Sequence, residues 1–160
     1  MLNFTGIIGY DDLKNELEMI GDTISNPDKY DRFNVKSPKS ILIYGDHGMG
    51  KTSWAKRFME SFDFPCIPYV KSGEFQEDIP GLFQNASGFS SCFLFIDDLD
   101  KSIDDESDFE ILRRCMEEAK NKRIFVIATV TRNAGEFSKY WQNLQPEPDL
   151  KVRFTWSMKR

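Results

Sequence analysis

The stretch that decides the fold is ILIYGDHGMGKTSWAKRF, which runs from Ile41 to Phe58. It opens with four apolar or aromatic residues, a pattern typical of a short buried strand bounded by turn residues. Three glycines follow in a short loop, and a Lys-Thr pair then opens a helical pattern. This order of strand, glycine-rich loop and helix predicts that the backbone of the loop folds closely around a ligand.

The loop has the spacing of a phosphate-binding site. Residues 45–52 read GDHGMGKT and fit G-x-x-x-x-G-K-[ST] in full, between a strand and a helix start. Glycines allow backbone N–H groups to point inward at an anion, and the helix N-terminus adds positive potential. We expect Lys51 to reach the outer phosphates and the Thr52 hydroxyl to ligate Mg²⁺. The alternative is a glycine-rich turn that only joins strand and helix, and the agreement of pattern with context argues against it.

The whole loop is assigned to nucleotide binding. Its residues are Gly45, Asp46, His47, Gly48, Met49, Gly50, Lys51 and Thr52. His47 and Met49 occupy variable positions, and we expect neither to act as a side-chain ligand or a base. Because His47 is the only histidine, neither a histidine metal site nor a Ser-His-Asp triad is expected.

A second candidate site is the stretch CFLFIDDLD, residues 92–100. Asp97 follows a buried apolar run, at the strand end where open α/β sheets bind ligands. We expect it to hold Mg²⁺ through water, with Asp98 placed to orient or deprotonate an attacking water. The alternative is a solvated acidic loop. That alternative stays open for Asp98, and it is our expectation from Asp100 onward.

Composition sets further bounds. The chain has 160 residues, which is enough for one domain with a core. Its net charge of −5 argues against a nucleic-acid surface. Its apolar runs are too short to span a bilayer and its start does not resemble a signal peptide, so we expect no membrane segment and a cytoplasmic location. Cys66, Cys92 and Cys115 are far apart and odd in number, which favours buried, reduced thiols.

Strands and helices alternate along the rest of the sequence. Helices are predicted over residues 11–25, 51–62 and 134–142. A short helix is predicted to begin at Pro27 with Asn26 as its N-cap, and another to follow a capping box formed by Ser107 and Glu110. Strands are predicted over residues 41–44, 66–70, 92–96, 124–129 and 151–156. Continuous apolar strands that alternate with helices predict a mostly parallel sheet covered on both faces. Pro68 cannot donate a ladder hydrogen bond, which pushes its strand to an edge of the sheet.

A longer set of segments resembles a known family. These segments are FTGIIGYDDLKNEL, NPDKYDRFNVKSPKSILIYGDHGMGKTSWAKRF, PCIPYVKSGEF, LFIDDLD and RIFVIATVTRN. Together they resemble AAA+ ATPase modules of the FtsH and proteasomal-ATPase kind, as far as about Asn133. The resemblance implies a P-loop NTPase of the α/β class, with a five-stranded sheet in the order 5-1-4-3-2 between helices. Residues 1–160 would form one nucleotide-binding core that a helical segment, residues 1–40, leads into.

The resemblance also implies ligands, partners and residue roles. It implies ATP or ADP with Mg²⁺ as cofactors, and assembly into a homo-oligomer or a ring with other AAA+ subunits. Ile8 and Gly9 match the backbone segment that flanks adenine in the family. Asp97 matches the Walker B aspartate, Asp98 stands at the position of the catalytic glutamate, and Thr131 matches the sensor-1 residue that helps to position the water or the γ-phosphate. The Walker A loop is matched by Gly45, Gly48, Gly50, Lys51 and Thr52.

Two departures from the family pattern concern the chemistry. Asp98 is one methylene shorter than the usual glutamate, and because position matters at near-attack distances we expect slower hydrolysis. No arginine occurs between Arg132 and Arg153, where the resemblance places the arginine fingers. Since such an arginine accelerates related phosphoryl transfers by several orders of magnitude, weak or partner-dependent turnover is expected.

Two further departures concern architecture. Ile79-Pro80-Gly81 stands where the family has an aromatic pore loop, in a segment that looks shortened. We expect Phe75 and Phe83 to pack in the core instead, which places a polypeptide-threading role in doubt. The small helical lid of the family, with its sensor-2 arginine, is expected to be absent from this chain.

Three functional hypotheses follow. The leading one is an AAA+ core that binds ATP, hydrolyses it with Mg²⁺ and couples nucleotide state to conformation or assembly. The second is a diverged binding module that holds nucleotide without hydrolysis. The third is a small-molecule kinase, which the acidic segment after Asp100 and the lack of an arginine-rich lid disfavour.

Overall fold

Helices and strands alternate along the described part of the chain. A computed structural model describes residues 2, 4, 11–34, 37–44 and 50–130. The elements are α1 (Asp11–Ser25), α2 (Pro27–Asp31), β1 (Ser40–Tyr44), α3 (Lys51–Glu60), β2 (Cys66–Pro68), α4 (Phe75–Ala86), β3 (Cys92–Ile96), α5 (Leu99–Ser102), α6 (Glu106–Glu118) and β4 (Ile124–Val130).

The four described strands form one parallel sheet in the order β1-β4-β3-β2. This order confirms the 1-4-3-2 part of the predicted sheet, and the α/β class with it. The predicted fifth strand, residues 151–156, and the predicted helix over residues 134–142 lie outside the described residues.

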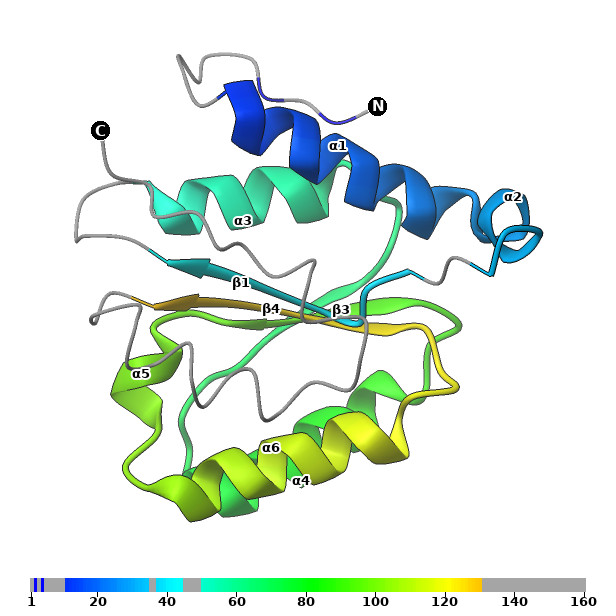
Figure 1. The fold of residues 1–160 in the computed structure, drawn as a ribbon. Coiled ribbons are helices and arrows are strands. Elements are labelled where there is room, and N and C mark those ends of the chain that lie inside the picture. Colours follow the sequence, from blue (N-terminus) through cyan, green and yellow to red (C-terminus); the bar gives the residue numbers. More distant parts are fainter. Residues whose placement is uncertain (1, 3, 5–10, 35–36, 45–49, 131–160) are drawn as a thin grey trace.

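Helices cover both faces of this sheet. Figure 1 shows α1 and α3 on one face and α4 and α6 on the other, with α5 beside the carboxyl ends of the strands, where α3 begins. Each face has its own hydrophobic core. The strand pleat separates the two cores, since Phe93 and Phe95 pack on the α3 side and Leu94 and Ile96 on the α6 side. Burial on both faces explains why the strands read as continuous apolar runs.

Strand β2 forms the edge that Pro68 predicted. The Pro65 carbonyl accepts from the Phe93 N–H at 2.9 Å, and the Tyr69 N–H donates to the Phe95 carbonyl at 2.7 Å. Because backbone groups alternate in direction along a strand, the nitrogen of Pro68 faces the outer edge of the sheet. Its lack of an N–H therefore removes no hydrogen bond to a neighbouring strand. The strand ends at Pro68 rather than at the predicted residue 70.

Helix α4 occupies the segment that was compared with a pore loop. Phe75, Ile79 and Phe83 are all buried on its inner face, which confirms that the two phenylalanines pack in the core. Pro80 lies inside this helix and is exposed. The spacing of the buried residues, rather than Pro80, decides the local structure here.

Some boundaries differ from the sequence expectations. Helix α1 matches the predicted range, whereas α3 ends at Glu60. The cap of α6 is Asp105, whose side chain accepts from the Asp108 N–H at 3.2 Å, so the predicted cap at Ser107 is wrong.

All three cysteines are free thiols, but Cys66 is exposed at the sheet edge, and only Cys92 and Cys115 are buried as expected. Among the described residues, no helix is both long enough and apolar enough to cross a membrane.

Candidate nucleotide-binding site

The site begins at Gly50, the residue that precedes α3. Its φ is +83°, in the left-handed region that favours glycine, and its carbonyl accepts the N–H of Trp54 at 3.0 Å. Nothing lies within 4 Å of the place where a Cβ would stand. The backbone conformation, rather than a lack of space, therefore calls for glycine here.

Lys51 and Thr52 are the first two residues of α3, as the sequence predicted. The Lys51 side chain is 6% exposed, and Thr52 is half-buried. The Thr52 hydroxyl donates to Oδ1 of Asp97 at 2.9 Å. The phosphate-loop helix and the end of β3 therefore meet at one place, as a shared nucleotide site requires.

The strand pleat explains why Asp97 faces α3. Phe93 and Phe95 point to the α3 side of β3, so Asp97 is the next residue on that side. Ile96 pairs with Ala128 in the neighbouring strand β4, and the following residues are Asp97 and Thr129. The Thr129 hydroxyl donates to Oδ1 of Asp97 at 2.5 Å. Two hydroxyl groups, from α3 and from β4, thus converge on one carboxylate oxygen.

Asp98 turns away from the sheet immediately after Asp97. Its φ of 53° and ψ of 51° are left-handed, and its N–H donates to the Thr129 hydroxyl at 2.8 Å. Its carboxylate lies 3.7 Å from the ammonium group of Lys101, with side-chain exposures of 41% and 60% respectively. Because both groups meet water, this ion pair contributes little to stability. It does place a cation beside the predicted catalytic carboxylate.

Asp100 is not solvated, which corrects the sequence expectation. It lies in α5, the short helix that packs against β4, and is 1% exposed. Asp104 and Asp105 are exposed as expected, but Asp108 is 6% exposed. Its carboxylate accepts from the Asp104 N–H at 2.8 Å and from Gln76 at 3.1 Å, so it ties the loop before α6 to α4.

The oxygen donors at this site fit a magnesium ion. Thr52 and Asp97 offer a hydroxyl and a carboxylate, the hard ligands that Mg²⁺ prefers, and Asp97 is exposed at a groove of about 530 Å³ between α3 and β2. The described residues contain no group of three or more His, Cys, Asp or Glu that could hold a metal. A nucleotide-bound Mg²⁺ does not require one, because phosphates and water supply most of its ligands.

Several predicted site residues lie outside the described part of the chain. They are Ile8, Gly9, Gly45, Asp46, His47, Gly48, Met49 and Thr131. Their assignments stay predictions. The structure brings Thr52 and Asp97 into contact and places Asp98 beside them. It also adds two residues that sequence reasoning missed, Thr129 and Lys101.

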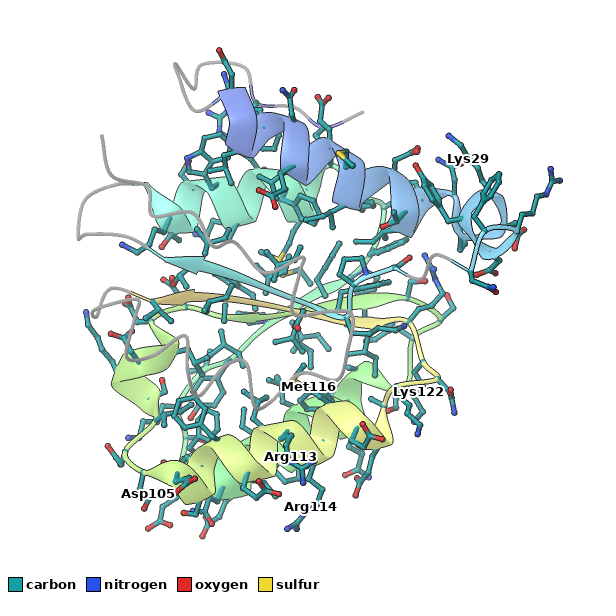
Figure 2. The ribbon with its side chains drawn as sticks, in the orientation of Figure 1. Lys29, Asp105, Arg113, Arg114, Met116 and Lys122 are labelled. Carbon is teal, nitrogen blue, oxygen red and sulfur yellow. The ribbon has the colours of Figure 1, made fainter. Side chains whose placement is uncertain are left out.

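Arg113 and Arg114 lie outside the segment between Arg132 and Arg153 where the arginine fingers were expected. Figure 2 shows both on α6, in the layer across the sheet from α3. Arg113 is bound to Glu110 of the same helix, with a nitrogen–oxygen distance of 2.5 Å, and Arg114 is exposed. They therefore belong to a solvated helix face rather than to the cluster around Asp97.

Comparison with known proteins agrees with this geometry. The model of the ATPase family associated with various cellular activities, abbreviated AAA, matches residues 41–143. This chain belongs to the AAA family. ATP with Mg²⁺ is the usual cofactor of AAA ATPases of this type, which confirms the cofactor prediction. The match also confirms the resemblance to FtsH-type modules and the P-loop α/β class.

The AAA chain is similar to several ATP-dependent zinc metalloproteases. It is 37% identical over 107 residues to FtsH of Trieres chinensis, which covers 62% of this chain and 16% of that protein. It is 37% identical over 105 residues to FTSH 9 of Oryza sativa, covering 61% of this chain and 13% of the relative. A YME1 homolog of Schistosoma mansoni is 32% identical over 107 residues, which covers 62% of this chain and 16% of that protein. The matched part therefore spans less than a fifth of each of these relatives.

Proposed function

We propose that this chain is an ATP-binding core that hydrolyses ATP with Mg²⁺ and couples nucleotide state to conformation or assembly. The observation that carries this proposal is the 2.9 Å hydrogen bond between Thr52 and Asp97. It joins the start of the phosphate-loop helix to the acidic end of β3, the two protein groups that hold Mg²⁺ in P-loop NTPases. Family membership supplies the same expectation independently.

Each residue at this place has a proposed role. Lys51 binds the outer phosphates, and Thr52 and Asp97 would hold the metal, which supplies charge neutralisation at the phosphate oxygens when it is bound. Asp98 orients the attacking water or accepts its proton. Its short side chain gives less reach than a glutamate, so we expect a slow reaction.

Helix α4 bears on how nucleotide state is used. The residues compared with the aromatic pore loop form a helix whose buried face includes Phe75, Ile79 and Phe83. We therefore propose coupling through conformation or assembly rather than through pulling on a polypeptide with these aromatics. The relatives are named as zinc metalloproteases, and we restrict the proposed activity of this chain to ATP, because the match covers 16% or less of the three relatives described above.

A specific observation favours a second candidate, a nucleotide-binding module that does not hydrolyse ATP. Asp98 is paired with Lys101 at 3.7 Å, which gives its carboxylate a partner other than water. A carboxylate that is one methylene short of glutamate and has an ammonium group beside it is less well placed to reach an attacking water. The module would then hold ATP or ADP and act through its shape.

Assembly would decide between slow and fast turnover. We propose a homo-oligomer or a ring with other AAA subunits. This chain has no arginine between Arg132 and Arg153, where the fingers were expected, so a different AAA subunit in a mixed ring would supply that arginine. An arginine supplied by a partner raises related hydrolysis rates by about 10³- to 10⁵-fold. We also propose the cytoplasmic location that was expected from the sequence.

The deciding experiment is phosphate release from ATP and Mg²⁺, measured across a range of protein concentrations. A measurable rate that is lost in Asp98→Asn supports hydrolysis, and a rate per chain that rises with protein concentration supports assembly. If the chain binds ATP but releases no phosphate at any concentration, the non-hydrolysing module replaces the leading proposal. A chain that binds no nucleotide contradicts both.

A further inference from the structure

Thr129 is a buried hydroxyl in an otherwise apolar strand. Strand β4 reads IFVIATV, and every residue in it is buried. Thr129 itself is 1% exposed and lies in the strand between β1 and β3. A hydroxyl in such a place needs hydrogen-bond partners, and the identity of those partners shows what it does.

Both partners belong to the acidic end of β3. The Thr129 hydroxyl donates to Oδ1 of Asp97 at 2.5 Å and accepts the N–H of Asp98 at 2.8 Å. A hydroxyl has one hydrogen to give, and the carboxylate can only accept it. The direction of both bonds is therefore fixed, and one side chain holds two consecutive acidic residues.

These two bonds act on different properties of the site. Thr52 and Thr129 donate to the same oxygen of Asp97, so together they fix the rotation of that carboxylate. Asp98 is one of only two described non-glycine residues with positive φ, and its N–H is anchored by Thr129. A backbone conformation of this kind costs free energy and persists where its surroundings hold it.

We infer that Thr129 is a positioning residue that orients Asp97 for Mg²⁺ and holds Asp98 in its left-handed conformation. The inference rests on the proposed nucleotide function and deepens it by one residue. A purely structural hydroxyl would change the stability of the fold without changing how nucleotide affinity responds to Mg²⁺. A positioning residue changes that response, because Asp97 acts on the nucleotide through the metal.

The test is the affinity of the 160-residue chain for ATP, measured by calorimetry with Mg²⁺ and again with a chelator in its place. The dissociation constant without Mg²⁺ divided by the dissociation constant with Mg²⁺ reports the contribution of the metal. Thr129→Val keeps the shape of the side chain and removes the hydroxyl. We expect it to lower this ratio by about 10- to 100-fold, the usual effect of removing a group that orients a metal ligand. Affinity without Mg²⁺ should stay at the parent value.

Two further variants isolate the hydroxyl. Thr129→Ser keeps it and should restore most of the parent ratio. Thr23→Val removes a hydroxyl that donates to the Ile20 carbonyl at 2.6 Å within α1, and should leave the ratio unchanged. If Thr129→Val does not fold, Thr129→Cys replaces it, because a thiol of similar volume is only a weak donor. Thr129→Cys is expected to lower the ratio of the dissociation constants as much as Thr129→Val.

The outcomes separate this inference from the proposed function. A parent chain whose ATP affinity does not respond to Mg²⁺ contradicts the proposed function, and the role of Thr129 fails with it. A parent that responds, with a Thr129→Val variant that responds equally, overturns the role of Thr129 alone. Loss of the response in Thr129→Ser would also overturn it, since the hydroxyl would then not be the cause.

Discussion

The hydroxyl of Thr52 and the carboxylate of Asp97 lie 2.9 Å apart although 45 residues separate them in the sequence. One residue belongs to the first turn of α3 and the other follows the last residue of β3. Parallel strands bring their carboxyl ends to one edge of the sheet, and the pleat turns Asp97 toward the face that α3 covers. The contact therefore follows from topology, and it places the phosphate-binding and metal-binding groups together.

Lys51→Ala should abolish ATP binding. The variant removes the ammonium group that is proposed to neutralise the outer phosphates, while α3 keeps a good helix-forming residue at its start. Titration calorimetry with ATP and Mg²⁺ measures the effect. Lys120→Ala, which removes an exposed lysine just after α6, is the control and should bind like the parent. Equal affinity in the Lys51 variant and the parent would remove Lys51 from the site.

Asp98→Asn should keep ATP binding and lose phosphate release. The amide has nearly the shape of the carboxylate but cannot accept a proton, so a loss of about 10²- to 10⁴-fold in rate is expected for a general base. A phosphate-release assay measures the rate, and calorimetry checks the binding. Asp104→Asn, an exposed acid in the loop before α6, should release phosphate at the parent rate. An Asp98 variant as fast as the parent would show that another group activates the water.

Phe93→Ala should strongly destabilise the fold. Phe93 is fully buried, and its ring lies 5.3 Å from that of Phe62, 5.5 Å from that of Phe64 and 5.8 Å from that of Phe125. Truncation leaves a cavity in the α3-side core, with an expected cost of about 3–5 kcal/mol in the free energy of unfolding. Urea titration measures it.

The matched control for that truncation is Phe89→Ala. Phe89 is 48% exposed and lies outside both hydrophobic cores, so its loss should change the free energy of unfolding by about 0.5 kcal/mol. Equal costs for the two variants would mean that the aromatic cluster around Phe93 does not form the core described above.

Asp78→Asn should make the fold less sensitive to acid. The hydroxyl and N–H of Ser72, followed by the Gly73 N–H and the Tyr69 hydroxyl, lower the pKa of Asp78 to about 2 from 3.8. A carboxylate with a lowered pKa in the folded state stabilises the fold above its unfolded pKa, and this contribution is lost as pH falls from about 4 to about 2.

Urea midpoints measured across that pH range test the role of Asp78. The parent should lose stability more steeply with falling pH than the Asp78 variant. Asp63→Asn, which changes an exposed aspartate, serves as the control and should follow the parent. Parallel curves for the parent and Asp78→Asn would show that the hydrogen bonds to this carboxylate do not hold the loop before α4.

The sequence predicted those parts of the site that are encoded locally. A glycine-rich loop, a Lys-Thr pair and an aspartate after an apolar run are each visible in a few residues. Thr52 and Asp97 were found in this way, and the structure shows them in contact. Pro68 located the sheet edge for a similarly local reason, because a residue without an N–H cannot serve a central strand.

What the sequence did not predict depends on register and packing. The role of Thr129 follows from the pairing of Ile96 with Ala128, and strand register between distant segments is not encoded in a local pattern. Asp100 was expected to be solvated because acidic residues surround it, but the short helix α5 packs it against the sheet. Helix α4 was missed because its segment was compared with the pore loop of the family, although Phe75, Ile79 and Phe83 recur at helical spacing.

The most direct test of the central claim is the stability of the chain in ATP with Mg²⁺. Unfolding by urea is followed with no nucleotide and with nucleotide at about a hundred times its dissociation constant, in the parent and in Asp97→Asn. The shared site predicts a gain of about 2.7 kcal/mol in the parent. It predicts a smaller gain in Asp97→Asn at the same nucleotide and Mg²⁺ concentrations, because metal binding is weakened there. Unfolding curves of the parent that do not move with ATP and Mg²⁺ would contradict the claim that Lys51, Thr52 and Asp97 form one nucleotide site.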